Sequence, residues 1–319
     1  MNEASSKYVD QIAIQKLLKE KLTRVHHSPG ESGSSYDTGF EDFATSANPP
    51  NGVRESKRDS FTELSFRSSL SSKYEESNQV RCRVFPAKEP TGEILFVHGL
   101  YEDNMQIYDF FIALLNEQGM NVYLLVLPFH YKRKPGESTF SGEFFWSADV
   151  DRSAFAFKQA VYDLAQLYQY VKARTGRKVW IVGFSMGGGV ALRLASLLAL
   201  DGVFVINPVC NITELMWNSP LFSTIKADLE ENNQTFDMIK ERYSQLEPLN
   251  VGDVEISREN VVLGKGLYDQ INDPANYDLL AERWGVKHVL SYKAGHLNIL
   301  RVPKMAVDIA RFYAGEGAQ

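Results

Sequence analysis

The chain has 319 residues, of which 44% are hydrophobic and 23% are charged, and its formal net charge is −6. This composition is typical of a globular protein with one large α/β domain or two ordinary ones, and it excludes a disordered chain. The acidic balance argues against nucleic acid or an anionic membrane as the main partner.

Neither the cysteines nor the hydropathy pattern indicates a secreted or membrane-spanning protein. Cys82 and Cys210 are the only cysteines, so they form no disulfide framework and have no metal-ligand spacing. No window reaches the ~18 consecutive apolar residues of a transmembrane helix. The first residues lack the basic and apolar regions of a secretory signal. We therefore expect a cytoplasmic protein without stable membrane insertion.

The first sixty residues are expected to form an N-terminal helix and a linker, separate from a domain over 61–319. Apolar residues recur at helical spacing between residues 7 and 25, at Ile14, Leu17, Leu18, Leu22 and Val25. We expect this amphipathic helix to dock on the domain surface or on a dimer partner, with membrane contact as the alternative. Residues 28–59 are rich in Ser, Gly, Asn and Pro and predict a loop or linker.

Residues 61–70 and 79–85 alternate between apolar and polar side chains and predict two strands, which we expect to pair as a hairpin at one edge of a sheet. From Glu93 the pattern changes to nearly continuous apolar strands that alternate with amphipathic helices. The strands are expected at 93–99, 121–129, 178–183, 202–209, 259–264 and 288–292, and the helices at 106–118, 153–173, 186–200, 276–284 and 303–314. This alternation predicts an α/β fold, with a mostly parallel sheet, helices on both of its faces, and antiparallel strands at the N-terminal side.

A segment at about 211–252 interrupts the alternation. Its apolar residues, among them Leu221 and Phe222, recur at helical spacing. Because the segment follows a sheet strand, we expect it above the carboxyl ends of the strands, where open α/β sheets bind ligands. We interpret it as a helical cap that lines the substrate pocket; the alternative is that it only adds packing.

The stretch Gly183-Phe184-Ser185-Met186-Gly187 matches the pattern G-x-S-x-G, between a predicted strand and a predicted helix. So sharp a turn forces its middle residue into strained backbone geometry, and side chains two positions away on either side would collide. Glycine removes that collision. The turn also aims the first N–H groups of the helix at a reacting oxygen. Ser185 is therefore a candidate nucleophile.

With this motif the sequence resembles the α/β-hydrolase superfamily over about residues 80–315. Phe96 to Leu100 look like the His-Gly segment of that superfamily, so the resemblance implies an oxyanion hole made by the backbone N–H groups of Leu100 and Met186. Gly266 to Ile271 look like the turn that carries the acid, Asp269, and Ala294 to Leu297 look like the loop that carries the histidine, His296. The order Ser185, Asp269, His296 is the one expected for this fold.

These residue types predict acyl transfer. His296 would take the proton of Ser185 during attack on a carbonyl and return it to the leaving group, while Asp269 would orient the imidazole. The acid has two competitors, Asp273 and Asp278, but Asp269 lies nearest to the end of the preceding strand. We expect His98 to be structural and to hold the oxyanion loop.

Further side chains are candidates for substrate binding. Tyr101 follows the His-Gly segment and could line the pocket. His130 and the basic run 132–134 leave a predicted strand at the active-site end and could receive an anionic group, although a basic run on a loop is also typical of a solvated surface. This region loosely resembles a poorly characterised branch of the superfamily, which does not identify a substrate.

The leading hypothesis is a serine hydrolase of the esterase or lipase type, which cleaves a small-molecule ester or thioester and needs no metal or organic cofactor. A peptidase or an acyltransferase would use the same residues. A haloperoxidase-like enzyme or a C–C bond hydrolase shares the triad as well. A catalytically silent binding protein on the same scaffold is the alternative from another class, although a complete triad in order argues against it. The sequence indicates neither the acyl group nor the oligomeric state.

Overall fold

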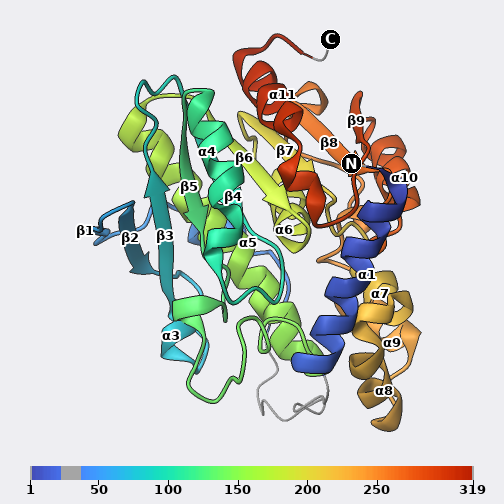
Figure 1. Cartoon of the computed structure of the whole chain (residues 1–319). Coiled ribbons are helices and arrows are strands. Elements are labelled where there is room, and N and C mark those ends of the chain that lie inside the picture. Colours follow the sequence, from blue (N-terminus) through green and yellow to red (C-terminus); the bar gives the residue numbers. More distant parts are fainter. Residues whose placement is uncertain (1, 23–36, 318–319) are drawn as a thin grey trace.

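The computed structural model describes residues 2–22 and 37–317, and its nine described strands form one sheet (Figure 1). The strand order is β1-β2-β3-β5-β4-β6-β7-β8-β9. Strands β5, β4, β6, β7, β8 and β9 are parallel, whereas β1, β2 and β3 pair antiparallel and β3 joins β5 antiparallel. The bounds are β1 (Arg54–Lys57), β2 (Thr62–Arg67), β3 (Gln79–Phe85), β4 (Gly92–Val97), β5 (Met120–Leu125), β6 (Val179–Phe184), β7 (Gly202–Ile206), β8 (Val261–Gly266) and β9 (His288–Tyr292).

Helices cover both faces of the sheet, as the sequence predicts. Helices α5 (Val150–Thr175), α6 (Met186–Ala195) and α10 (Ala275–Trp284) contribute to the core on one face, and α4 (Asp109–Glu117) and α11 (Pro303–Ala314) to the core on the other. Successive residues of the central strands enter opposite cores: in β4, Leu95 joins one and Phe96 the other. Burial on both faces explains why these strands read as continuous apolar runs.

The predicted cap consists of α7 (Ile212–Asn218), α8 (Ser223–Glu231) and α9 (Phe236–Tyr243), with a 3-10 turn η3 at Pro220–Phe222. It follows β7 and lies below the carboxyl ends of the strands in the view of Figure 1. Short polar residues begin its helices: Asn211 caps α7 by accepting the N–H of Glu214, and Thr235 caps α9 by accepting that of Met238. The cap packs against α5 through α9, and Tyr243 stacks on Trp146 of the loop that precedes α5.

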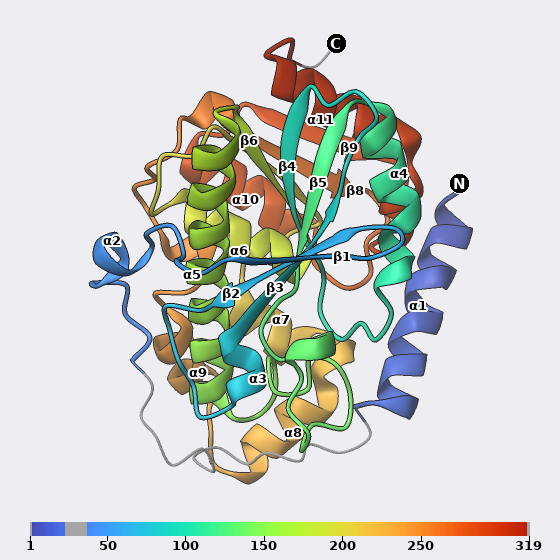
Figure 2. The same cartoon turned by 90° about the vertical axis from the view of Figure 1, so that its left-hand side faces the viewer.

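The prediction of a loop through residue 59 is wrong in two places. The short helix α2 spans Phe43–Ser46, and β1 adds an outer strand to the sheet beyond the predicted hairpin (Figure 2). All four residues of β1 are exposed and three of them are charged, so it has no apolar alternation to signal a strand. Charged side chains are typical of edge strands, because they oppose pairing with another chain. Residues 28–36 of the predicted linker lie outside the described residues.

The remaining elements differ from the predictions mainly at their ends. The predicted helix 186–200 ends at Ala195, and the predicted helix 106–118 begins as the 3-10 turn η1 (Met105–Tyr108). The short helix α3 (Glu75–Asn78) lies between β2 and β3, and 3-10 turns occur at η2 (Tyr131–Arg133), η4 (Pro248–Asn250), η5 (Arg258–Asn260) and η6 (Asn298–Arg301). In the described part of the chain, no helix combines the length and the apolar character needed to cross a bilayer.

The predicted N-terminal helix is α1 (Glu3–Glu20), and it contacts the cap at the 3-10 turn η3 (Figure 1). Its buried residues are Ser6, Asp10 and Ile14, whereas Val9 and Ile12 are exposed. The buried face is therefore partly polar, which the predicted apolar stripe did not suggest. Val25, the last residue of that stripe, lies outside the described residues.

Candidate active site

Ser185 lies on a sharp turn between the end of β6 and the start of α6, with φ = 53° and ψ = −118°. This positive φ is unfavourable for a residue with a side chain and is typical of a strained functional position. A Cβ atom on Gly183 would come within 2.5 Å of the Gly187 carbonyl oxygen. A Cβ atom on Gly187 would overlap the carbonyl oxygen of Val97 in β4. Both glycines are therefore required by backbone crowding, as expected for the motif.

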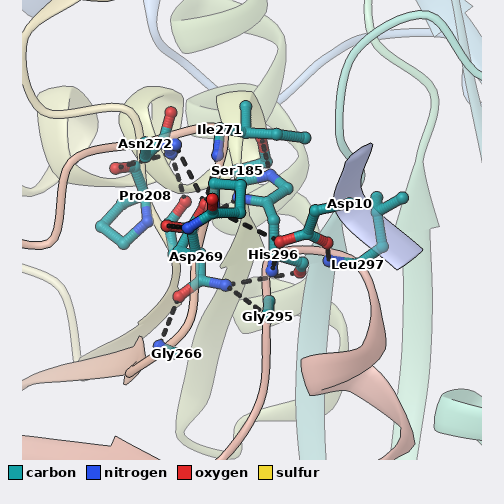
Figure 3. Close-up of polar contacts among 12 residues, drawn as sticks. Asp10, Ser185, Pro208, Gly266, Asp269, Ile271, Asn272, Gly295, His296 and Leu297 are labelled. Carbon is teal, nitrogen blue, oxygen red and sulfur yellow. Dashed lines mark hydrogen bonds and ion pairs between the residues drawn. The ribbon is translucent and has the colours of Figure 1, made fainter. Parts of the chain in front are cut away.

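The turn presents the Ser185 hydroxyl to His296, which lies in the loop after β9 (Figure 3). The His296 Nε2 atom is 2.9 Å from the Ser185 Oγ atom, and its Nδ1 atom is 2.8 Å from the Asp269 Oδ2 atom. All three side chains are buried. The structure thus brings together the three residues that the sequence nominates, in a chain of two hydrogen bonds.

The Asp269 carboxylate is held in place by its own turn after β8. Its Oδ1 atom accepts the backbone N–H groups of Ile271 at 2.8 Å and Asn272 at 3.0 Å, and its Oδ2 atom accepts the Tyr277 hydroxyl at 3.1 Å. The competing carboxylates are engaged elsewhere: Asp273 accepts the N–H of Ala275, and Asp278 pairs with Lys265. Of the three candidates, Asp269 is the one that contacts His296.

The electrostatic surroundings favour the protonated form of His296. Burial alone would lower the pKa of the imidazole, but the charge and hydrogen bond of Asp269, together with the charge of Asp10, outweigh it and raise the pKa above its ordinary value. The imidazolium that would form during proton transfer is therefore stabilised by two carboxylates.

The loop after β4 carries the predicted oxyanion donor Leu100. Leu100 and Met186 line the same cavity, and within the described residues neither backbone N–H group has a hydrogen-bond acceptor. His98 holds this loop: its Nδ1 atom contacts the Gly99 carbonyl oxygen at 2.6 Å, and its Nε2 atom accepts the N–H of Leu127 at 3.0 Å. Burial lowers the pKa of His98 to about 4, so the ring is neutral and serves the structural role expected of it.

A mostly apolar cavity opens above Ser185. Tyr101, Leu221 and Phe222 line it, as the sequence predicts, together with Leu215 of the cap and Ile271. Its volume is about 60 Å³, far below the ~300 Å³ at the lower end for small-molecule sites. The Tyr101 side chain is fixed by donating its hydroxyl to the Trp146 carbonyl oxygen at 2.6 Å. The cavity is therefore small.

Helix α1, which the sequence does not assign to the site, forms part of the cavity wall. Ala13 and Leu17 line the cavity. At the far end of the helix, the Lys21 Nζ atom donates to the Tyr101 carbonyl oxygen at 2.6 Å and pairs with Asp103. Asp10 contacts the histidine loop. The spacing of Ala13 and Leu17 on one helix face was visible in the sequence, but nothing in it indicates which surface that face meets.

His130 and the basic run 132–134 do not reach the cavity, so the prediction that they could face the pocket is wrong. His130 is fully buried against Pro128 and the aromatic ring of Phe145. The Arg133 guanidinium pairs with Asp163 at 2.7 Å, and both side chains are completely buried.

The other two residues of the basic run are engaged as well. Lys132 pairs with Glu63, and Lys134 donates to the Ser138 carbonyl oxygen. Lys132 and Arg133 thus anchor the loop to β2 and α5, whereas the contact of Lys134 lies within the loop itself. The basic run 132–134 therefore neither binds an anion in the cavity nor forms a fully solvated surface.

The model of a family described as "Alpha/beta hydrolase family" matches residues 94–298, more than half of the chain. No curated protein matches the chain significantly.

Among solved structures, an acetyl xylan esterase from Paenibacillus sp. R4 is 14% identical with a TM-score of 0.63, over 94% of this chain and 98% of that one. A soluble variant of the monoglyceride lipase of Saccharomyces cerevisiae is 16% identical with a TM-score of 0.56, over 85% of this chain and 97% of that one. The Pyrococcus furiosus esterase Pf2001 is 16% identical with a TM-score of 0.55, over 84% and 98%. At these identities the likeness concerns the fold.

Proposed function

Because this chain belongs to the alpha/beta hydrolase family, we propose that it is a serine hydrolase that cleaves a carboxylic ester or thioester through an acyl-enzyme intermediate. The observation that carries the proposal is the hydrogen-bond chain from Ser185 through His296 to Asp269 at a strained strand-to-helix turn. A binding protein has no need for a nucleophile, a base and an orienting acid in line.

In the proposed mechanism, the Ser185 hydroxyl attacks the substrate carbonyl while His296 Nε2 accepts its proton. The oxyanion of the tetrahedral intermediate is stabilised by the N–H groups of Leu100 and Met186, each worth roughly 10²–10³ in rate. The protonated imidazole then donates to the leaving alcohol or thiol, and the acyl group stays on Ser185. Water, activated by the same histidine, attacks the acyl-enzyme and releases the acid.

The apolar wall of the cavity favours a substrate with a hydrophobic acyl group. Leu221 and Phe222 of η3 and Leu215 of α7 lie over Ser185, so the apolar end of a substrate would find an apolar surface beside the nucleophile. The esterases and lipases among the similar structures have this fold, and their acyl esters are the first substrates to try.

A fluorophosphonate probe and a chain-length series of aryl esters and acyl thioesters test the proposal. We expect the wild-type chain to be labelled at Ser185, as located by mass spectrometry, and to hydrolyse part of the series. Ser185→Ala should abolish labelling and lower kcat on the order of 10⁴-fold or more while the protein stays folded. Ser196→Ala, at the other end of α6, is the matched control and should label normally.

Labelling that persists in Ser185→Ala would refute the assignment of the nucleophile. A wild-type chain that neither labels nor turns over any member of the series would support the silent binding protein. Transfer of the acyl group to an added alcohol in preference to water would identify an acyltransferase.

A further inference from the structure

Asp10 of helix α1 joins the two loops that carry the histidine and the acid. Its Oδ2 atom accepts the backbone N–H of His296 at 2.7 Å and that of Gln270 at 3.3 Å, and its Oδ1 atom accepts the N–H of Leu297 at 3.1 Å (Figure 3). Gln270 directly follows Asp269 in the chain. One carboxylate therefore holds the backbone on both sides of the hydrogen bond between Asp269 and His296.

The burial of Asp10 is unusual for a carboxylate. The side chain is completely buried, and in the described part of the chain no lysine or arginine pairs with it. Burial raises the pKa of the Asp10 carboxyl, whereas its hydrogen bonds to the backbone N–H groups above and the charge of His296 favour the ionised form. Burying a charge without a cation is costly, and the three N–H groups that donate to its two oxygens offset part of that cost. The position of this charge suggests that it serves the neighbouring histidine.

The rest of α1 is arranged to keep Asp10 in place. One turn earlier, the Ser6 Oγ atom accepts a hydrogen bond of 3.0 Å from the Nδ2 atom of Asn298, which follows His296 in the histidine loop. About three turns later, Lys21 is bound to the oxyanion loop through the Tyr101 carbonyl oxygen. A Cβ atom on Gly295 would lie 2.6 Å from Asp10 Oδ2, so the loop approaches the carboxylate as closely as glycine allows. The helix thus connects the histidine loop to the oxyanion loop across the cavity.

We propose that Asp10 is a positioning residue of the active site, which sets the register of the histidine and acid loops and adds a second negative charge beside the imidazole of His296. The inference rests on the proposed function, because it assigns His296 the role of general base. During proton transfer the imidazole becomes positive, so a fixed negative charge nearby stabilises the transition state more than the ground state.

The groups that titrate around His296 come from several elements. Asp269 lies on the loop after β8, with Tyr277 of α10 bonded to it, and Asp10 lies on α1. Glu102 of the loop after β4 lines the same cavity, and burial raises its pKa to about 8. A change in the ionisation of His296 must therefore be separated from that of Glu102.

The decisive experiment compares Asp10→Asn with Ser6→Ala in the full chain. Asparagine has the same shape but no charge, and its amide nitrogen cannot accept the N–H groups. Ser6→Ala removes one hydrogen bond between the same helix and the same loop without a change of charge. The pKa of His296 is measured by NMR titration of its imidazole, and kcat and KM are measured on the best aryl ester over a range of pH.

We expect Asp10→Asn to lower the pKa of His296 by ~0.5–1 unit, less than the 1–3 units of a charge in direct contact, because Asp10 meets the histidine through its backbone. The acidic limb of the rate profile should move by the same amount to lower pH, and kcat should fall roughly 10-fold or more with KM little changed. A limb near the pKa of Glu102 should not move. Ser6→Ala keeps the charge of Asp10, so it should shift the pKa of His296 and the acidic limb by much less than Asp10→Asn does.

An unchanged His296 pKa in Asp10→Asn, or an equal shift in Ser6→Ala, would overturn the inference. If Asp10→Asn does not fold, Asp10→Ser replaces it, because serine adds no volume, accepts one N–H and is also uncharged; the same shift is expected. The NMR titration requires no turnover, so failure of the proposed function leaves this measurement valid. Loss of activity in the wild-type chain and loss of coupling between Asp10 and His296 are thus distinguishable.

Discussion

Replacing Asp269 by asparagine should invert the hydrogen bonding of His296. The Asp269 Oδ1 atom accepts two backbone N–H groups, from Ile271 and Asn272, so the single oxygen of an asparagine must occupy that position. Its amide nitrogen then faces His296 Nδ1, where the carboxylate oxygen was 2.8 Å away. A donor at this place forces Nδ1 to become the acceptor, and the proton moves to Nε2.

The imidazole in that tautomer cannot take the proton of Ser185. We expect Asp269→Asn to reduce kcat by roughly 10⁴-fold, the size of effect found when a triad aspartate is replaced elsewhere, which corresponds to about 5.5 kcal/mol of lost transition-state stabilisation. Folding should change little, because the Tyr277 hydroxyl can turn and accept from the new amide instead of donating to the carboxylate. KM should stay near its wild-type value, because Asp269 binds no part of the substrate.

Hydrolysis of an aryl ester and thermal unfolding, measured on the same preparations, test this prediction. Asp273→Asn is the matched control: the Asp273 side chain accepts the N–H of Ala275 and does not contact His296, so this variant should keep most of the activity. An Asp269→Asn variant within tenfold of the wild-type kcat would refute the tautomer argument. A large loss in Asp273→Asn would show that the acid has been assigned to the wrong residue.

Three further predictions concern the base, the cap and the basic loop. The neutral imidazole of His296 is the base, and its pKa is raised, so kcat/KM should fall as the pH drops through a midpoint above the ordinary pKa of histidine. A midpoint at or below that pKa would contradict the role of the carboxylates of Asp269 and Asp10. Serine at Leu221 and Phe222 should raise KM for long acyl chains more than for acetate, and an equal effect on both would exclude the cap as the acyl wall. Arg133→Met should destabilise the fold by about 3–5 kcal/mol in a denaturant titration, because Asp163 is left buried and unpaired, with KM unchanged; a raised KM would restore the anion-binding role.

The features that the sequence predicts well are those with local causes. The turn at Ser185 needs glycines at 183 and 187 because their own backbone is crowded, and the strand before it is apolar because both of its faces are buried. The position of Asp269 could be predicted from its distance to the end of β8, since a side chain one turn further along could not reach back to His296.

Asp10 could not be found in this way. Its partners are backbone N–H groups, which every residue but proline has, so no complementary side chain elsewhere in the sequence signals the contact. In the helical pattern Asp10 counts as a polar residue, and polar residues are expected to face solvent.

The basic run was misleading for a related reason. A buried cation such as Arg133 is recognisable only with its partner, and Asp163 lies in the middle of a long helix among other polar residues. Sequence spacing does not show that the loop folds back over that helix. His130, next to the run, was likewise assigned to the pocket because it follows a strand at the correct end of the sheet, although its ring turns into the core.

The hydrogen bond between Asp10 and His296 joins residues 286 positions apart, and this separation bears on when the site can form. A nascent chain exposes α1 long before the loop after β9 exists, so the helix has no docking surface until the sheet is almost complete. Contacts of such long range are made late, because the closure of a large loop costs entropy that only the assembled sheet can offset. The alignment of Ser185, Asp269 and His296 is therefore expected to be among the last steps of folding, after the sheet has reached most of its stability.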